Sequence, residues 1–118
     1  MNYTLLFYES PESLAARSDP AQRQAFWSAF GHYIQALRDA GVHAGGAGLQ
    51  LPETATTLTY RDGERLVQDG PYADTKEQLG GFVILSVPDL DTALEWAARA
   101  PAAPGRVIEV RPNLAPME

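Results

Sequence analysis

The sequence predicts an α+β sandwich of the ferredoxin-like kind, in which two helices cover one face of a mainly antiparallel sheet. Three observations lead to this fold class. Strand and helix patterns follow one another in the order strand, helix, hairpin, strand, helix, strand. Each helical segment has one apolar face. Residues 82–87 are apolar on both faces, which is typical of a central strand.

Composition and charge limit the classes of protein to which this chain can belong. The 118 residues are 45% hydrophobic, which fits one globular domain over residues 1–118. A net charge of −6 argues against nucleic-acid binding, because phosphates repel carboxylates. The absence of cysteine excludes disulfides, thiolate metal ligands and a cysteine nucleophile. His32 and His43 have no convergent carboxylates in the pattern, so we predict neither a metal nor a cofactor.

No targeting or membrane segment is expected. The first residues lack the basic stretch and long apolar run of a signal peptide. No apolar run approaches the roughly 20 residues that a membrane helix needs. We therefore expect a cytoplasmic protein without a membrane partner.

The first half of the chain holds one strand and the longest helix. Residues 3–8 are rich in aromatic and aliphatic side chains and predict a strand, whereas residues 9–18 predict a loop. Asp19 and Pro20 are typical of a helix start, and Gly41 marks its end. The buried face of this helix is expected to hold apolar residues at three- and four-residue spacing: Phe26, Phe30, Tyr33 or Ile34, and Leu37.

The middle of the chain is less regular. Residues 47–51 are compatible with either a short strand or a loop. The glycines among residues 45–48 favour a flexible turn. Residues 55–60 and 64–68 are expected to pair as a hairpin, because Asp62-Gly63 between them is a strong turn signal.

The last third returns to regular structure. Residues 82–87 predict the central strand, and Asp89 or Asp91 caps a second helix. Residues 106–111 predict the last strand, and residues 113–118 show no regular pattern. The second helix is expected to bury a stripe of small and aliphatic side chains: Leu90, Ala93, Leu94 and Ala97.

Alternation in the last strand predicts an uncovered sheet face. If Ile108 and Val110 point to the helices, Val107, Glu109 and Arg111 point to the opposite face. Apolar residues on that face would be exposed in a single chain, and a second copy packed sheet to sheet would cover them. We therefore predict a homodimer with a partly polar cavity between the two sheets.

Several motifs together resemble one known family. Asp69-Gly70-Pro71-Tyr72, then residues 75–82 (Thr-Lys-Glu-Gln-Leu-Gly-Gly-Phe), then Glu109-Val110-Arg111-Pro112, resemble the DGPF-type branch of the YCII-related family. Tyr72 stands where that branch usually has Phe, and Asp74 stands where Glu is frequent. The resemblance implies a dimeric α+β barrel with a polar cavity. It also implies a regulatory setting, because members of this branch are often encoded beside extracytoplasmic-function sigma factors.

The loop before the central strand carries the candidate catalytic residues. Asp69 opens a tight turn, where a partly desolvated carboxylate can act as a general acid or base; its simpler role is to hold the turn. Lys76 can bind an anionic group or stabilise developing negative charge, or can be a solvated loop charge. Glu77 and Tyr72 are candidate substrate-binding residues on the same loop.

The last strand supplies the other candidates. Glu109 and Arg111 share one face, where they can orient a small anionic ligand or form an ion pair at an interface. Two functions remain open. The first is a small-molecule enzyme, active or degenerate, with its acid–base site in a cavity of the dimer. The second is a noncatalytic ligand-binding or regulatory module that acts with transcription machinery.

Overall fold

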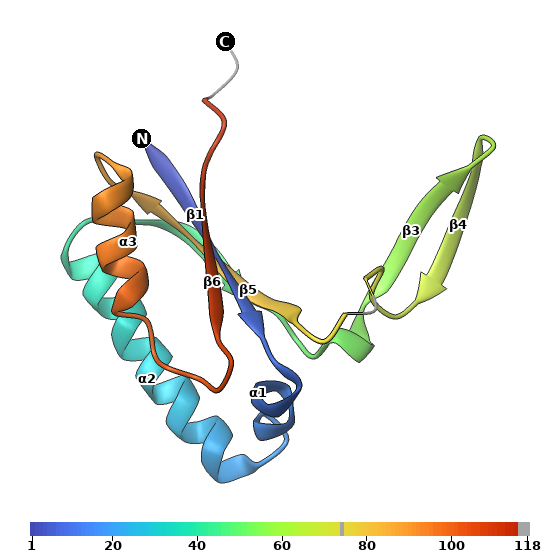
Figure 1. Ribbon diagram of the computed structural model, residues 1–118, viewed down its shortest axis with the longest axis horizontal. Helices are drawn as coiled ribbons and strands as arrows, with labels where there is room; N and C mark the ends of the chain where they lie inside the picture. Colours follow the sequence, from blue (N-terminus) through green and yellow to red (C-terminus); the bar gives the residue numbers. More distant parts are fainter. Residues whose placement is uncertain (74, 116–118) are drawn as a thin grey trace.

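The computed structural model describes residues 1–73 and 75–115. Asp74, one of the motif positions above, and residues 116–118 of the tail lie outside this part. Figure 1 shows the elements in chain order: β1 (Asn2–Glu9), α1 (Pro11–Ala16), α2 (Pro20–Asp39), β2 (His43–Gly48), the 3-10 turn η1 (Pro52–Thr54), β3 (Thr56–Arg61), β4 (Glu64–Asp69), β5 (Gln78–Ser86), α3 (Leu90–Ala98) and β6 (Val107–Pro112).

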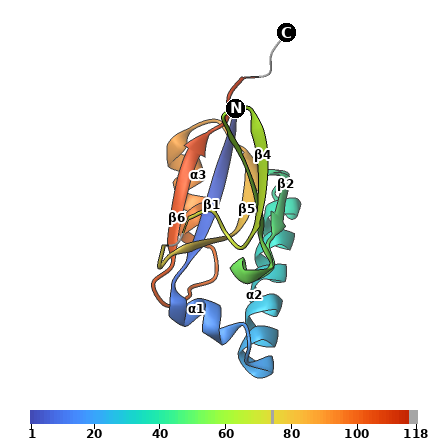
Figure 2. The ribbon, with the colours of Figure 1, turned by 90° about the vertical axis from the view of Figure 1, so that its right-hand side faces the viewer.

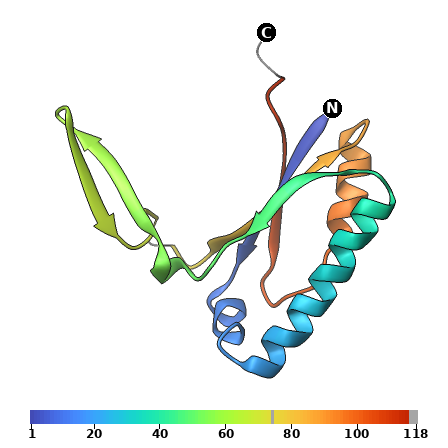
Figure 3. The ribbon, with the colours of Figure 1, turned by 180° about the vertical axis from the view of Figure 1, so that it is seen from behind.

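The predicted α+β arrangement is confirmed. Four strands form one sheet in the order β2-β5-β1-β6, and every neighbouring pair is antiparallel. This strand order is consistent with a ferredoxin-like fold. Both long helices, α2 and α3, lie on one side of this sheet, which is clear from the front and from behind (Figures 1 and 3).

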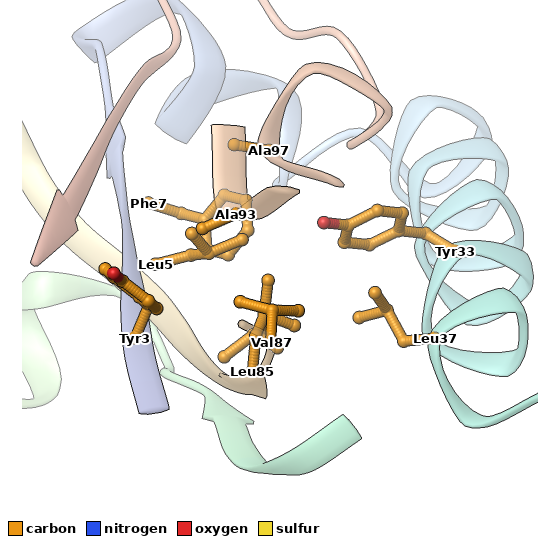
Figure 4. Close-up of a cluster of buried hydrophobic side chains, with 10 residues drawn as sticks. Tyr3, Leu5, Phe7, Tyr33, Leu37, Leu85, Val87, Ala93 and Ala97 are labelled. Carbon is orange, nitrogen blue, oxygen red and sulfur yellow. The ribbon is translucent and has the colours of Figure 1, made fainter. Parts of the chain in front are cut away.

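The core lies between this sheet and the two long helices. Leu5, Leu37 and Leu85 have no exposed surface and come from β1, α2 and β5 (Figure 4). Tyr33 also ties α2 to α3, because its hydroxyl donates a hydrogen bond of 2.8 Å to the carbonyl of Trp96. Burial raises the pKa of Tyr33 to about 12, against a smaller lowering by the positive charge of Arg99.

Local signals set the helix ends correctly. Asp19 accepts a hydrogen bond from the backbone of Ala21, and Pro20 is the first residue of α2. Gly41 follows the helix with φ 73°, a conformation that glycine adopts without strain. Asp89 caps α3 by accepting from the backbone of Thr92. The predicted buried stripe of α3 is confirmed only in part, because Ala93 and Ala97 are buried while Leu90 and Leu94 are exposed.

Two segments differ from expectation. The predicted loop at residues 9–18 contains α1, whose start is capped by Ser10 through a hydrogen bond from the backbone of Ser13. The glycine-rich residues 45–48 are not a flexible turn but part of strand β2. A Cβ at Gly46 would lie 2.5 Å from the carbonyl oxygen of Phe82, so glycine allows the close approach of β2 to β5.

The predicted hairpin forms an arm that projects from the body. Strands β3 and β4 pair only with each other, and Asp62 and Gly63 at their turn have φ 52° and 79°. The arm extends away from the two long helices (Figures 1 and 3) and stands before the sheet in Figure 2. It explains why the radius of gyration is 16.1 Å, against about 13.5 Å for a compact domain of this length.

The second face of the main sheet is uncovered, as the alternation predicted. On β6, Ile108 and Val110 pack toward the core, whereas Glu109 pairs with Leu6 of β1 on the opposite face. Val107 is 52% exposed there. We call this surface the open face; its other partly exposed apolar members are Tyr8, Leu79, Phe82 and Ile84.

Candidate functional site

The Asp-Gly-Pro turn lies at the base of the arm. Asp69 is the last residue of β4 and is exposed. The backbone N–H of Gly70 donates to Ala55 at 2.7 Å, and Thr57 Oγ1 donates to the carbonyl of Gly70 at 2.7 Å. Among the described residues, none of the hydrogen bonds that hold this turn involves the Asp69 carboxylate. The carboxylate is therefore presented on a turn that other groups stabilise.

Lys76 and Glu77 lie in the loop that leads to β5, and both are exposed. Gln78 shapes this loop, because its side-chain amide donates to the carbonyls of Ala73 and Thr75, both at 2.9 Å. Lys76 and Glu77 are thus presented to solvent directly before β5.

Glu109 and Arg111 meet on the open face. Arg111 Nη2 lies 2.6 Å from Glu109 Oε2, and this hydrogen bond raises the pKa of Arg111. The hydroxyl of Tyr8 lies 3.5 Å from Glu109 Oε1. The three side chains form a polar patch among the apolar residues of the open face.

The predicted site residues therefore fall into separate groups within one chain. Asp69 and Tyr72 line one hollow of about 430 Å³ at the base of the arm. Glu109 and Arg111 form their pair on β6. In the described part of the chain, no hydrogen bond or ion pair joins these groups to each other or to Lys76. Their assembly into one site stays a prediction.

A buried ion cluster that the sequence analysis missed lies at the end of β1. Glu9, the last residue of β1, is only 3% exposed. Its Oε2 lies 3.3 Å from Arg17 Nη1, and its Oε1 lies 3.6 Å from Arg106 Nη2. Arg17 directly follows α1 and Arg106 directly precedes β6, so the fold brings together residues from three parts of the chain.

Aromatic rings lie close to both guanidinium groups. The Cζ atom of Arg106 lies 5.6 Å from the ring centre of Phe7 and 5.4 Å from that of Phe26. The Cζ atom of Arg17 lies 5.5 Å from the ring centre of Trp27. Such cation–π contacts stabilise the cations without using their N–H donors.

The cluster lines a pocket of about 260 Å³ between α2 and the sheet, which we call the α2 pocket. Helix α2 supplies Phe26, Trp27 and Phe30, and the facing backbone belongs to the glycines of β2 and β5. His43 also lines it, whereas His32 is exposed on α2. An aromatic pocket with a few charged groups is the usual form of a small-molecule site.

Hydrogen bonding in the cluster is incomplete. Among the described residues, Glu9 Oε2, Arg17 Nη1 and two nitrogens of Arg106 (Nε and Nη1) have no hydrogen-bond partner. Burial lowers the pKa of Arg106; Glu9 opposes this effect and Arg17 adds to it. Arginine nevertheless stays protonated in proteins, so the cluster contains two cations and one carboxylate.

One sequence signal pointed to this cluster. The inward positions of β1 alternate as Tyr3, Leu5, Phe7 and Glu9, and all four are buried. An acid in the inward register of a strand needs a cationic partner. The sequence alone does not say which arginines reach it, because the partners are set by how α1 and the approach to β6 pack.

The fold and these sites define a class of small α+β domains with a strand order consistent with ferredoxin-like proteins. The chain belongs to the YCII-related domain family, which it matches over residues 1–114. It is also similar to a protein of Rhizobium meliloti (strain 1021) that is described as uncharacterised, with 50% identity over 48 residues. That match covers 40% of this chain and 39% of the relative's length.

Two properties of the described residues bear on other classes of site. No group of three or more histidine, aspartate or glutamate side chains is placed to hold a metal ion in residues 1–73 and 75–115. In the same part of the chain, no helix has the length and apolar character needed to cross a membrane.

Proposed function

We propose that the protein is a homodimeric small-molecule-binding domain with an acid–base site, assigned to the DGPF-type branch of its family and working in the cytoplasm. The open face carries this proposal. It combines an exposed apolar surface with the polar patch of Glu109, Arg111 and Tyr8. Packing two open faces together would remove the apolar surface from water and enclose the polar patch.

The arm supports the same assembly. All six residues of β4 are exposed, and Tyr60 and Val67 are 72% and 59% exposed. A lone two-stranded hairpin is only marginally stable in water. A second copy lying against the arm would bury these side chains, and the dimeric α+β barrel is the assembly that we propose.

Each predicted residue has a role in this proposal. Asp69 is the general acid or base, and Lys76 stabilises negative charge on a small anionic ligand. Glu109 and Arg111 orient the ligand, and the exposed ring of Tyr72 closes over it with Glu77 nearby. The second copy would bring the arm of one subunit toward the open face of the other.

Sedimentation tests the dimer. The wild type is expected to sediment as twice the mass of one chain, and Ile84→Glu, on the open face, as a folded single chain, because a buried carboxylate opposes packing. Leu94→Glu is the matched control, since Leu94 is an exposed leucine on α3, on the other side of the sheet. A wild-type protein that stays a single chain at high concentration would overturn the dimer.

Ligand binding tests the acid–base site. A metabolite panel is screened for compounds that raise the melting temperature, because a ligand that binds only the native state stabilises it. Asp69→Asn and Lys76→Ala are expected to reduce that shift or any turnover found. Asp62→Asn at the tip of the arm is the control. If both site variants behave like the control while the dimer persists, the assignment is wrong.

A regulatory module is the second candidate, favoured by the net charge of −6 and by the exposed arm as a protein-binding surface. In this role the chain would act with sigma-factor machinery and would need no substrate. Co-purification with a sigma factor, together with an absence of small-molecule thermal shifts, would favour this function over the first.

A further inference from the structure

The ion cluster of the α2 pocket has an unbalanced charge. Arg17 and Arg106 contribute two positive charges, and Glu9 contributes one negative charge. Their side chains are 10%, 8% and 4% exposed, so water screens the remaining positive charge poorly. Glu9 is the only acid among the described residues that line the pocket. Arg38 of α2 also lines it, but Arg38 is exposed, so water screens its positive charge. One monoanion would neutralise the cluster, whereas a dianion would reverse the imbalance.

The arginines also keep unused hydrogen-bond donors. Arg17 Nη2 donates to the carbonyl of Leu49 at 2.8 Å, but its Nη1 and two nitrogens of Arg106 have no partner in the described chain. The contacts to Glu9, at 3.3 and 3.6 Å, are longer than a close charge-assisted hydrogen bond. The two guanidinium groups can therefore serve a second carboxylate without losing strong bonds to Glu9.

The rest of the pocket suits a flat apolar group. Phe26, Trp27 and Phe30 form one wall, and backbone of β2 and β5 forms the other. A Cβ built on Gly48 would lie 4.0 Å from Trp27 Cζ3, so the glycine leaves open the space in front of the indole. The volume of about 260 Å³ lies just below the usual range for ligand sites, which limits the ligand to a small one.

We propose that the α2 pocket binds a small organic monocarboxylate with a flat apolar body. Its carboxylate contacts Arg17 and Arg106, and its body lies between Trp27 and the glycine backbone of β2. This site lies on the helix-covered side of the sheet and needs no second copy. It is therefore independent of the open face and of the dimer proposed above.

Calorimetric titration with three small probes tests the charge argument. Benzoate is a monoanion, benzyl alcohol has a similar ring but is neutral, and phenyl phosphate is a dianion near pH 8. Benzoate is expected to bind, and each of the other two to bind at least about tenfold more weakly. Equal binding of benzoate and benzyl alcohol, or no binding of benzoate at millimolar concentration, would overturn the proposal.

Two variants locate the site. Arg106→Gln is expected to weaken benzoate binding by about 10- to 100-fold, because it removes a charge-assisted contact. Arg65→Gln, at an exposed arginine of the arm, is the matched control and should bind like the wild type. Wild-type affinity in Arg106→Gln would contradict the proposed site.

Gly48→Leu provides a second test of the site in case the Arg106→Gln variant does not fold. It leaves every charge in place and fills the space in front of Trp27, and the backbone at Gly48 does not require glycine. Benzoate binding should be lost while circular dichroism stays unchanged. In the wild type, benzoate should shift the amide NMR signals of Gly46 and Gly48 and the indole N–H signal of Trp27. Retained binding in Gly48→Leu, or shifts confined to other residues, would place benzoate elsewhere and refute the site.

Discussion

Gly80 leaves the space that the carboxylate of Glu9 occupies. A Cβ at Gly80 would lie 2.7 Å from Glu9 Cδ and 2.8 Å from its Oε2, closer than real Cβ contacts come. Gly80 belongs to β5 and Glu9 to the neighbouring strand β1. The glycine pair that precedes residues 82–87 in the sequence thus has a packing role: it allows an acid to lie inside the sheet–helix layer.

Gly80→Ala is expected to destabilise the protein by about 1–3 kcal/mol, because the added methyl group must displace a buried carboxylate. The measurement is chemical unfolding followed by circular dichroism. Gly31→Ala is the control: a Cβ at Gly31, within α2, meets nothing within 4 Å. It should stabilise the protein by about 0.5–1 kcal/mol, since alanine favours a helix. A neutral effect of Gly80→Ala would show that Glu9 relocates freely.

Glu9→Gln is expected to cost roughly 3–5 kcal/mol, because it leaves two buried cations without a balancing charge. Urea unfolding measures the loss. Glu12→Gln, at an exposed acid of α1, should change stability little. Equal stability of the two variants would mean that the arginines find other partners or move into water when Glu9 loses its charge.

Tyr33 should make the protein sensitive to alkali. Its pKa in the folded protein is raised to about 12 by burial, above the ordinary value of 10.0. The neutral hydroxyl thus contributes stability that is complete below pH 10 and is lost as the pH rises toward 12. Tyr33→Phe is expected to be less stable than the wild type at pH 8 but to lose less stability between pH 10 and about 12.

Thermal unfolding across this pH range distinguishes Tyr33 from the other tyrosines. Tyr60→Phe is the control, because Tyr60 is exposed on the arm. It should follow the wild-type curve. If Tyr33→Phe and the wild type lose stability in parallel above pH 10, another group controls the alkaline transition.

Asp89 should contribute to acid sensitivity. Its hydrogen bonds, first to the Thr92 side chain and then to the Thr92 backbone, lower its pKa below the ordinary 3.8. The cap therefore stabilises α3 above that ordinary value and is lost as the pH falls through the lower, folded value. Asp89→Ser keeps a capping oxygen that does not titrate, so its melting temperature should fall less in acid than that of the wild type.

Acid-induced melting of the Asp89→Ser protein is compared with that of Asp91→Ser. Asp91 is an acid in the first turn of α3, but it is not the cap. A wild-type acid response in Asp89→Ser, together with an altered one in Asp91→Ser, would assign the effect to the helix dipole rather than to the cap.

Much of the fold was predictable because its signals are local. Asp19, Pro20 and Gly41 mark the ends of α2 through bonds and dihedral angles within a few residues of themselves. The Asp62-Gly63 turn likewise specifies the hairpin without help from the rest of the chain. Alternation in β6 correctly placed Glu109 and Arg111 on the uncovered side of the sheet.

Other elements depend on distant partners. Glycine-rich β2 has little strand preference of its own, and it exists because its backbone pairs with β5 at a distance that only glycine permits at Gly46. Helix α1 was expected as a loop, because a helix of six residues that begins at Pro11 is too short to show a helical pattern.

The sequence by itself determined the alternation of strands and helices, the helix caps and the hairpin turn, because each rests on neighbouring residues or on strand periodicity. Only the tertiary structure decided that Arg17 and Arg106 meet Glu9, that Gly80 makes room for it, and that an aromatic pocket forms beside them. Burying a carboxylate requires cations from whichever segments pack nearest, and that proximity is set by the packing of the whole chain rather than by local spacing.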